Sequence, residues 1–377
     1  MRSSELFKSQ YREMARGISV AVRLKRALST TADLIAPRAY RRSSLARRLT
    51  QFCAKSAKLQ RPVVAVAVRQ GGNAERNLVT IVRSGGRISI SCLESAILDY
   101  QNEVYFRLGA VLALLANTPL KEFRAIADIS DGEDSAPGLL SFCSRDPSAI
   151  LIPDHLFVWS RGYEQYRQLA DANRTEWGAR SDRVVWRGST TGSGKISSES
   201  LSTDDPDLLL RVRLCLRLKE TPGCDVKISA ITQSSDLTQD KQRLAGAGIL
   251  GEFISPLAWH TFKFAIDIDG NSNAWSNFFT RLIMGCCVLK IASPLGFRQW
   301  YYSDLKAWTH YVPVKADLSD LQEQIVWCRQ NHDECRRIAA SGQAFAMERS
   351  YATEINSGIG RLSKALKDGG LRANLTP

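Results

Sequence analysis

The sequence predicts an α/β protein with two Rossmann-like lobes, and three observations indicate it. First, a chain of 377 residues is long for one hydrophobic core, so we expect two domains of ordinary size. Second, 44% hydrophobic and 24% charged residues are typical of a soluble globular protein. Third, short β-rich runs alternate with helical stretches from about residue 62 onward. This alternation favours βαβ units and parallel sheets.

The alternation falls into two blocks. In the first block, strands are expected at 62–68, 78–82, 88–92 and 123–129, with a helical stretch over 93–117. In the second block, the expected strands are 183–187, 225–231, 263–268, 286–291 and 310–314, with helices between them and from 318 onward.

The polar, charged segment 171–182 is the candidate for the crossing between the two blocks. We therefore expect a basic N-terminal arm over 1–61, a first lobe over 62–175, a second lobe over 176–350, and a C-terminal helix and tail over 351–377.

The positive charge is concentrated at the N-terminus. Residues 1–61 hold 15 Lys and Arg residues and three acidic residues, whereas the rest holds 36 basic and 35 acidic residues. Such an arm could bind anionic lipid or nucleic acid, or remain a solvated tail. Apolar residues among the charges favour a basic amphipathic helix at a membrane surface. These residues are Val20, Val22, Leu24 and Leu28.

The apolar runs and the cysteines indicate the cellular compartment in which the chain is expected. Charges interrupt every apolar run before residue 62, so a cleaved signal peptide is not expected. The run at 108–116 is about half of what a membrane span needs and predicts a buried helix. Nine cysteines with no CxxC pair favour reduced thiols in a cytoplasm. None of the four histidines has the spacing of a metal site, so we expect no metal.

The stretch VVWRGSTTGSGK at 184–195 has the composition of a phosphate-binding turn. It is not a P-loop, because Ser189 stands where the first glycine is needed and Ile196 stands where the magnesium-binding hydroxyl is needed. A strand that runs into a Gly/Ser/Thr turn still offers backbone N–H groups, hydroxyls and the Arg187 guanidinium to an anion. A solvated hairpin is the alternative.

Two further strand ends carry polar residues. A strand stops at Asp269-Gly270 and a helix begins near Ser276, so free N–H groups there could bind a phosphate. Alternatively, Asn273 or Ser276 only caps that helix.

The strand at 123–129 is followed by a group of carboxylates, which could supply a general base or could simply be solvated. This group comprises Asp128, Asp131, Glu133 and Asp134.

Five motifs in this order resemble glycosyltransferase family 90, which includes fungal capsule-associated proteins and animal protein O-glucosyltransferases. The resemblance covers about residues 120–350. The motifs are WRGSTTG at 186–192, FKF at 262–264 leading into IDGN at 268–271, VLK at 288–290, WTHYVPV at 308–314 and DLSDL at 317–321. The sequences at 296–302, 130–133 and 151–154 are most similar to those of the bacterial lipopolysaccharide-core branch.

The resemblance implies a GT-B fold with a cleft between the lobes, a UDP-sugar donor, no required metal or other cofactor, and inversion at the anomeric carbon. It makes 62–175 the acceptor-side lobe and 176–350 the nucleotide-sugar-binding lobe. It implies that the turn after Arg187 holds the diphosphate through Gly188, Ser189 and Thr190. Fixed donors and a guanidinium can neutralise the leaving UDP where no metal does so.

The resemblance also assigns the remaining site residues. Arg211 is the nearest match to a family arginine downstream of the turn, and Arg213 is the alternative. Asp131 matches the catalytic base, with Asp128 and Glu133 as alternatives. The other residues expected at the donor are Lys263, Asp269, Gly270, Asn273 and Ser276.

One departure from the family concerns an arginine that follows the DG…S element in many relatives. Phe278 stands at the matching position in this chain, and Arg281 follows one helical turn later. Either Arg281 substitutes for that arginine, or Asn273, Ser276 and the helix N-terminus suffice.

Together these observations predict an inverting, metal-independent glycosyltransferase that moves a sugar from a UDP-sugar to a lipopolysaccharide-core or other lipid-linked acceptor. We expect a cytoplasmic protein, peripheral on the inner face of the plasma membrane and bound there through residues 1–61. The alternative is a nucleotide-binding protein without catalytic activity whose basic arm binds nucleic acid, a partner that the near-neutral body does not favour.

Overall fold

The protein forms two compact units, which are described separately. The first comprises residues 1–130 together with 362–377, and the second comprises residues 131–361. The computed structural model describes residues 38–56, 64–70, 77–96, 102–132, 139–172, 175–198 and 201–367.

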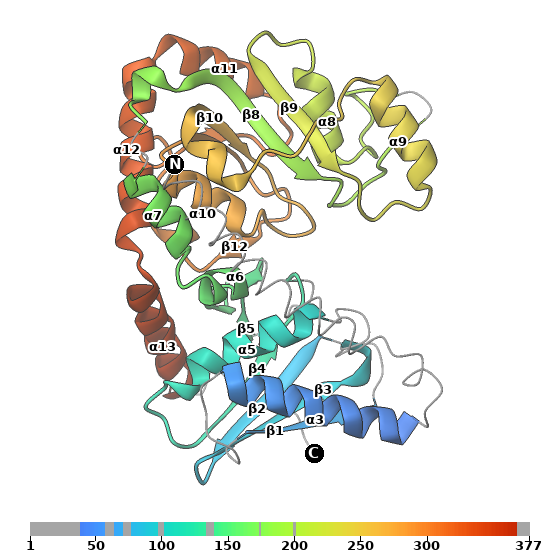
Figure 1. The fold of residues 1–377 in the computed structure, drawn as a ribbon, viewed down its shortest axis with the longest axis vertical. Coiled ribbons are helices and arrows are strands. Elements are labelled where there is room, and N and C mark those ends of the chain that lie inside the picture. Colours follow the sequence, from blue (N-terminus) through green and yellow to red (C-terminus); the bar gives the residue numbers. More distant parts are fainter. Residues whose placement is uncertain are drawn as a thin grey trace, which may run out of the picture. The chain divides into compact units, whose positions relative to one another are not determined.

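The first unit contains a sheet with strand order β1-β3-β2-β4 (Figure 1). Strands β1 and β3 are parallel, whereas β2 is antiparallel to both β3 and β4. The predicted parallel pairing is therefore confirmed for β1 and β3 but is wrong for β2, because a two-residue turn at 85–86 joins β2 and β3 as a hairpin. The elements are α3 (Arg38–Ser56), β1 (Val64–Arg69), β2 (Leu78–Ser84), β3 (Arg87–Leu93), α5 (Asn102–Ala116) and β4 (Phe123–Asp128).

Helix α3 corrects the prediction that residues 1–61 form an arm. Leu45, Leu49 and Cys53 recur every four residues, so they form an apolar stripe, and all three are buried. The helix packs against β1 and α5, and the Arg42 guanidinium lies 3.5 Å from the Glu94 carboxylate. Residues 38–56 thus belong to the folded unit, while the predicted amphipathic segment near Val20 lies outside the described residues.

The apolar run at 108–116 forms the buried part of α5, as predicted, with Leu108, Leu112 and Leu115 fully buried. Among the described residues, no helix is long and apolar enough to cross a membrane.

The second unit is built on a five-stranded sheet in the order β13-β11-β10-β8-β9, and every neighbouring pair is parallel. This confirms the parallel sheet predicted for the second block. Because the strands are parallel, their carboxyl ends meet at one edge. The sheet strands are β8 (Ser181–Ser189), β9 (Cys224–Ala230), β10 (Phe262–Asp267), β11 (Cys287–Ile291) and β13 (Val312–Val314).

The second unit contains further elements besides that sheet. The short strands are β5 (Leu140–Ser141), β6 (Cys143–Ser144), β7 (Ile150–Leu151) and β12 (Arg298–Gln299). The α-helices are α6 (His155–Trp159), α7 (Glu164–Ala172), α8 (Leu210–Leu218), α9 (Leu237–Gly246), α10 (Ser276–Ile283), α11 (Leu321–Gln330), α12 (His332–Glu348) and α13 (Tyr351–Lys367), of which α13 continues past residue 361. The 3-10 helices are η2 (Trp177–Ala179), η3 (Pro256–Thr261) and η4 (Tyr302–Asp304).

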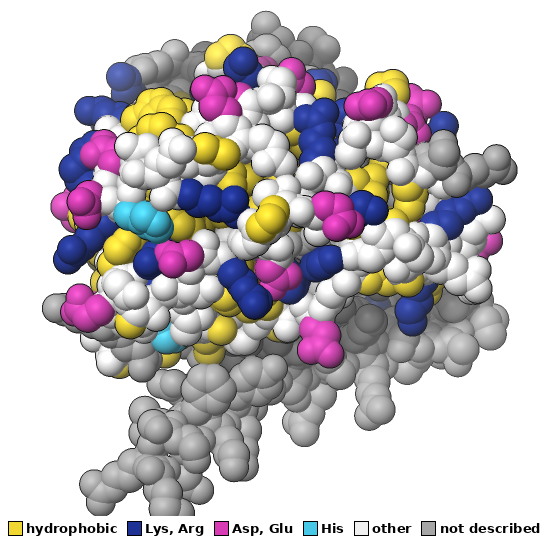
Figure 2. Space-filling view, turned by 90° about the horizontal axis from the view of Figure 1, so that it is seen from above, with side chains coloured by type: hydrophobic (Ala, Val, Ile, Leu, Met, Phe, Trp, Pro, Cys, Tyr) yellow, Lys and Arg dark blue, Asp and Glu magenta, His cyan; other side chains and the backbone are white. Residues whose placement is uncertain are grey.

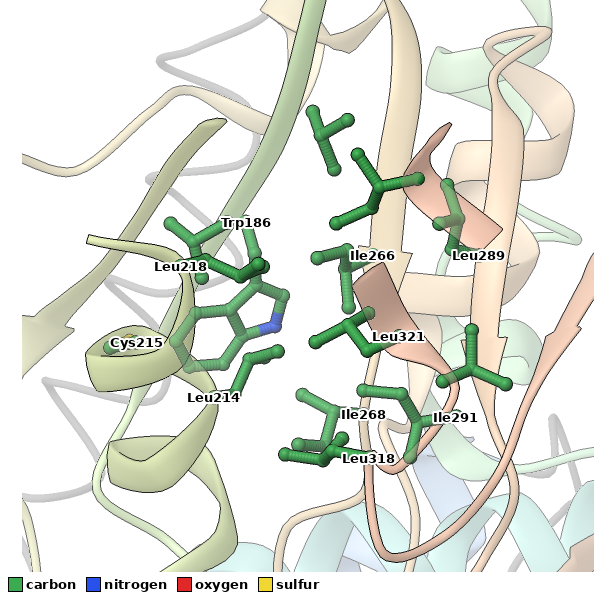
Figure 3. Packing of buried hydrophobic residues seen from close by; sticks show 14 of the residues in the cluster. Trp186, Leu214, Cys215, Leu218, Ile266, Ile268, Leu289, Ile291, Leu318 and Leu321 are labelled. Atoms are coloured by element: carbon green, nitrogen blue, oxygen red, sulfur yellow. The ribbon is translucent and has the colours of Figure 1, made fainter. Parts of the chain in front are cut away.

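The sheet of the second unit is buried on both faces. On one face the indole of Trp186 lies beside Leu214 and Leu218 of α8, and Ile266 and Leu289 continue the same cluster (Figure 3). Strands covered on both faces read as continuous apolar runs, which is why this block was recognisable from its sequence.

The other face explains why the second unit begins before the predicted boundary at 175/176. Phe157 and Tyr163 pack with Phe279 in the cluster on that face, so the segment that precedes β8 shares its core. Arg167 of α7 donates hydrogen bonds of 2.9 Å to the carbonyl of Ala346 and 2.7 Å to that of Arg349. These contacts tie α7 to the end of α12.

The described surface carries both signs of charge. Lys and Arg side chains are interspersed with Asp and Glu side chains over the described part of the face shown in Figure 2. This distribution agrees with the near balance of charge counted over residues 62–377.

Candidate functional site

A cavity of about 410 Å³ lies at the carboxyl edge of the parallel sheet. Ligands of open α/β sheets bind at this edge, where the loops after the strands converge. The lining comes from the turn after β8, the start of α8, and the segments after β10, β11 and β13. Its residues are Thr191, Gly192, Ser193, Pro206, Leu208, Leu209, Leu210, Arg211, Arg213, Asp269, Gly270, Pro294, Leu295, Ala316 and Asp317.

Arg211, in the first turn of α8, joins the two main segments of this edge. Its guanidinium donates to the carbonyls of Ser189 at 3.1 Å and Asp269 at 2.9 Å, and to Thr191 Oγ1 at 2.6 Å. Burial lowers its pKa from 12.5 to about 10, which leaves it charged at neutral pH. Arg211 therefore fixes the turn against the end of β10, and its donors are largely used by the protein itself.

Gly270 is required by the same close approach. A Cβ atom at this position would lie 2.7 Å from Thr191 Oγ1 and 3.0 Å from Nη2 of Arg211. Only glycine allows the two segments to approach so closely. The predicted Gly188 is similarly constrained, because a Cβ atom there would clash with the Trp186 indole.

Asn271 connects the turn to the predicted base. Its Oδ1 accepts the N–H of Gly192 at 2.9 Å, and its Nδ2 donates to Oδ2 of Asp131 at 3.4 Å. Asp131 is partly buried and so keeps access to solvent. The structure therefore brings Asp131 to the turn through one intervening amide.

The two alternatives to Asp131 are placed differently. Asp128 is a buried residue of β4 in the first unit, and its Oδ1 accepts the N–H of Ser130 at 2.7 Å. That contact is typical of an Asx turn. Glu133 lies outside the described residues.

A cluster of buried charges lies at the end of β10 and β11. The Lys290 ammonium is 2.8 Å from Oδ2 of Asp267 and lies over the rings of Phe278 and Tyr302 at 4.5 and 4.6 Å. Burial raises the pKa of Asp269 from 3.8 to about 6, against the opposing effect of Lys290. No residue of the described part of the chain hydrogen-bonds to Oδ2 of Asp269.

Arg187 and Thr190, which were predicted to bind the donor sugar nucleotide, are bonded to other parts of the protein. The Arg187 guanidinium donates to the carboxylate of Asp225 at 2.7 Å and to the carbonyl of Glu252 at 2.9 Å, so it ties β8 to β9 and to the segment after α9. The Thr190 hydroxyl donates to the carbonyl of Thr232 at 2.7 Å and accepts its N–H at 2.8 Å. These contacts indicate structural roles.

Lys263 lies at the opposite edge of the sheet. It is the second residue of β10, six positions before Asp269, which is about 20 Å along an extended strand. Its ammonium pairs with Oδ1 of Asp182 at 2.5 Å. The structure therefore separates Lys263 from the other predicted donor residues, because the FKF motif begins the strand and the cavity lies at its end.

The start of α10 differs from the predicted cap. Trp275 is the N-cap, with φ at 48°, and its side chain does not cap the helix, while Asn273 Oδ1 accepts the Trp275 N–H. Ser276 is the first helical residue. Arg281 does not line the cavity, since its guanidinium lies 4.1 Å from the centre of the Trp259 ring.

Thr191 and Asn271 complete the site beyond the predicted set, and Arg213, the predicted alternative to Arg211, also lies at the cavity. Arg213 lines the cavity, and no described residue bonds its Nε. Thr191 presents its hydroxyl between Ser189 and Arg211. Asn271 is the last residue of the IDGN motif, so the motif could have indicated it as a site residue. The partners of the Asn271 side chain come from positions far away in the sequence. The assembled site offers N–H groups, hydroxyls, a guanidinium and carboxylates to a polar, anionic ligand.

The chain matches the family described as Glycosyl transferase family 90 over residues 117–357. This match covers more than half of the chain, and the chain belongs to that family.

Curated relatives share part of the chain. Protein O-glucosyltransferase 3 of Homo sapiens is 27% identical over 226 residues, which is 58% of this chain and 39% of the human protein. Protein 035R of Invertebrate iridescent virus 3 is 31% identical over 231 residues, which is 55% of this chain and 19% of the viral protein. The chain thus spans less than half the length of either relative.

Solved structures give weaker likenesses. Alr3699/HepE of Anabaena, crystallised in complex with UDP, has a TM-score of 0.36 at 12% identity, over 71% of this chain and 77% of the other. The C-terminal domain of LpcC from Francisella tularensis has a TM-score of 0.31 at 11% identity, over 49% of this chain and 92% of that domain. At such low TM-scores neither likeness supports an argument about this chain.

Proposed function

We propose that this chain is a glycosyltransferase that moves a sugar from a UDP-sugar to an acceptor hydroxyl with inversion at the anomeric carbon. Membership of glycosyltransferase family 90 supports the reaction class. The observation that carries the proposal is the connection of Asp131 through Asn271 to a glycine-rich turn that lines a cavity. A base and an anion-binding turn are the two parts that such a transfer needs.

In the proposed reaction, Asp131 takes the proton of the acceptor hydroxyl while that oxygen bonds to the anomeric carbon of the donor. The bond between the anomeric carbon and the diphosphate oxygen breaks, and UDP leaves with the electron pair. N–H groups of the turn and the Arg213 guanidinium stabilise the leaving diphosphate. Arg211 acts indirectly, because it holds the turn and the end of β10 in place.

Asp269 completes the donor site in this proposal. Its Oδ2 lacks a partner among the described residues and its side chain lines the cavity, so it suits a hydroxyl of the donor. Burying an acceptor without a partner costs free energy that a bound ligand would recover.

For the acceptor, we propose a lipopolysaccharide-core or other lipid-linked glycan, used by a two-lobed GT-B enzyme at the cytoplasmic face of a membrane. The similarity of the motifs at 296–302 and 151–154 to the lipopolysaccharide-core branch supports this choice. The excess of Lys and Arg over residues 1–61 also supports it, since each cation near an anionic surface contributes about 1 kcal/mol.

The donor is tested by incubating the purified chain with UDP and a panel of UDP-sugars, with and without EDTA. We expect UDP to raise the melting temperature in the presence of EDTA, and one UDP-sugar to release UDP slowly. No response to any uridine nucleotide would overturn the donor assignment.

The membrane role is tested by sedimentation with vesicles that contain anionic lipid. Removal of residues 1–37 should weaken binding while leaving UDP release intact, because the deletion ends before α3. Vesicle binding that is unchanged by the deletion would exclude the membrane role, and binding to RNA instead would favour the nucleic-acid alternative.

A further inference from the structure

We propose that Asn271 is a positioning residue that orients the Asp131 carboxylate relative to the anion-binding turn. This inference rests on the proposed function. It adds a role to a side chain that lies between the base and the turn and bonds to both.

The backbone around Asn271 is held in place. Arg211 donates to the carbonyl of Asp269 at 2.9 Å, and the Gly270 N–H donates to the carbonyl of Asn273 at 3.3 Å. Asn271 therefore projects from a short loop that is fixed on both sides. A side chain on such a loop can transmit a defined geometry to its partners.

The amide group suits its two neighbours in only one orientation. The N–H of Gly192 requires an acceptor, so it fixes Oδ1 on the side of the turn at 2.9 Å. Nδ2 must then face Asp131, where it donates to Oδ2 at 3.4 Å. The turn thus determines which end of the amide meets the carboxylate.

This arrangement has a chemical consequence for the base. A donor at Oδ2 holds that oxygen in place and directs the other oxygen toward an incoming hydroxyl. The same amide also bonds to the turn, so one side chain aligns the base with the UDP-sugar bound there. Misplacement of a reacting group by about 1 Å can cost about 100-fold in rate.

The test uses Asn271→Asp, which keeps an acceptor for the Gly192 N–H but replaces the donor to Asp131 by a second carboxylate. We expect kcat for UDP-sugar turnover to fall about 100-fold, and the acidic limb of the pH–rate profile to move to higher pH, because like charges resist ionisation. The UDP Kd should rise, because the added carboxylate lies beside the anion-binding turn, so kcat is measured at saturating UDP-sugar, and the melting temperature should change little. Asn331→Asp is the matched control, since it also removes an Nδ2 donor, to the Trp327 carbonyl, and should leave kcat unchanged.

A double-mutant cycle separates positioning from a general structural effect. In an Asp131→Asn background, Asn271→Asp should cost little more, because its effect acts through the base. Full additivity of the two losses, or wild-type kcat in Asn271→Asp, would overturn the inference alone. Absence of UDP release by the wild-type chain with every UDP-sugar would overturn the proposed function, and this inference with it.

Discussion

The two edges of the parallel sheet in the second unit use their buried polar groups in different ways. At the amino edge, Lys263 pairs with Asp182 at 2.5 Å, and Arg180 donates to the carbonyls of Met284 at 3.1 Å and Gly285 at 2.6 Å. At the carboxyl edge, Asp269 Oδ2 and Arg213 Nε have no hydrogen-bond partner among the described residues.

Trp177 Nε1 at the amino edge also lacks a partner among the described residues, but it does not line the cavity, whereas Asp269 and Arg213 do. Buried polar groups are nearly always satisfied in native proteins, so two unsatisfied groups beside a cavity suggest a missing partner. The comparison predicts that substitutions at the carboxyl edge mainly impair activity, whereas those at the amino edge mainly impair stability.

The largest expected effect is that of Asp131→Asn. Loss of a general base typically costs about 100- to 10,000-fold in turnover, while the neutral, isosteric amide leaves donor binding nearly unchanged. The measurements are kcat for transfer and the Kd of UDP. A variant that loses UDP affinity but keeps its turnover per bound donor would show that Asp131 is not the base.

A second prediction concerns the pH dependence of stability. Because burial raises the pKa of Asp269 from 3.8 to about 6, the folded state binds this proton more tightly than the unfolded state. Its contribution to the free energy of unfolding is therefore greatest at low pH and falls by roughly 3 kcal/mol as pH rises from about 4 to 7.

The check is urea unfolding of the wild type and Asp269→Asn across that pH interval. The stability of the wild type relative to the variant should decline as pH rises. A constant difference would mean that the carboxylate is solvated or paired, and would weaken the assignment of an unsatisfied group to the carboxyl edge.

The third prediction tests the close approach at the cavity. Gly270→Ala places a methyl group 2.7 Å from Thr191 Oγ1, so the turn must move, at a cost of about 1–3 kcal/mol. We expect weaker UDP binding in a thermal-shift titration. Gly246→Ala is the control, because a Cβ there meets no atom within 4 Å and should leave UDP binding unchanged.

The smallest effect is expected at the amino edge. Asp182→Asn leaves the buried Lys263 ammonium without its carboxylate, but Asp182 is 65% exposed, so the loss should be only about 1 kcal/mol in unfolding free energy. The activity of the folded protein should be unchanged. A large fall in kcat/KM would show that Lys263 contributes to the donor site, and it would contradict the contrast between the two edges.

Much of the fold and part of the site were predictable from local sequence. The inner strands β10 and β11 of the second block are apolar runs buried on both faces, so each was recognisable in isolation. Ser189 ends β8, and Asp269 and Gly270 follow β10 within three residues, and parallel strands place such residues at a common edge. Asp131 follows β4, which belongs to the sheet of the first unit, so this rule does not account for its place beside the turn.

The choice among arginines could not be predicted in this way. Arg187, Arg211 and Arg213 carry the same guanidinium, and sequence distance does not show what each one contacts. Asp225 and Glu252 engage Arg187, and the carbonyls of Ser189 and Asp269 engage Arg211, which leaves Arg213 as the cavity arginine with an unbonded Nε. Those partners lie on other strands and loops.

By itself, the sequence determined the membership of glycosyltransferase family 90, the parallel sheet of the second unit and the order of the polar strand ends, because these depend on local patterns of residues. Only the tertiary structure decided the antiparallel pairing of β2, the docking of α3, the separation of Lys263 from the cavity and the bridge from Asn271 to Asp131. Each of these depends on contacts between residues distant in the chain, and such contacts exist only after the chain has folded.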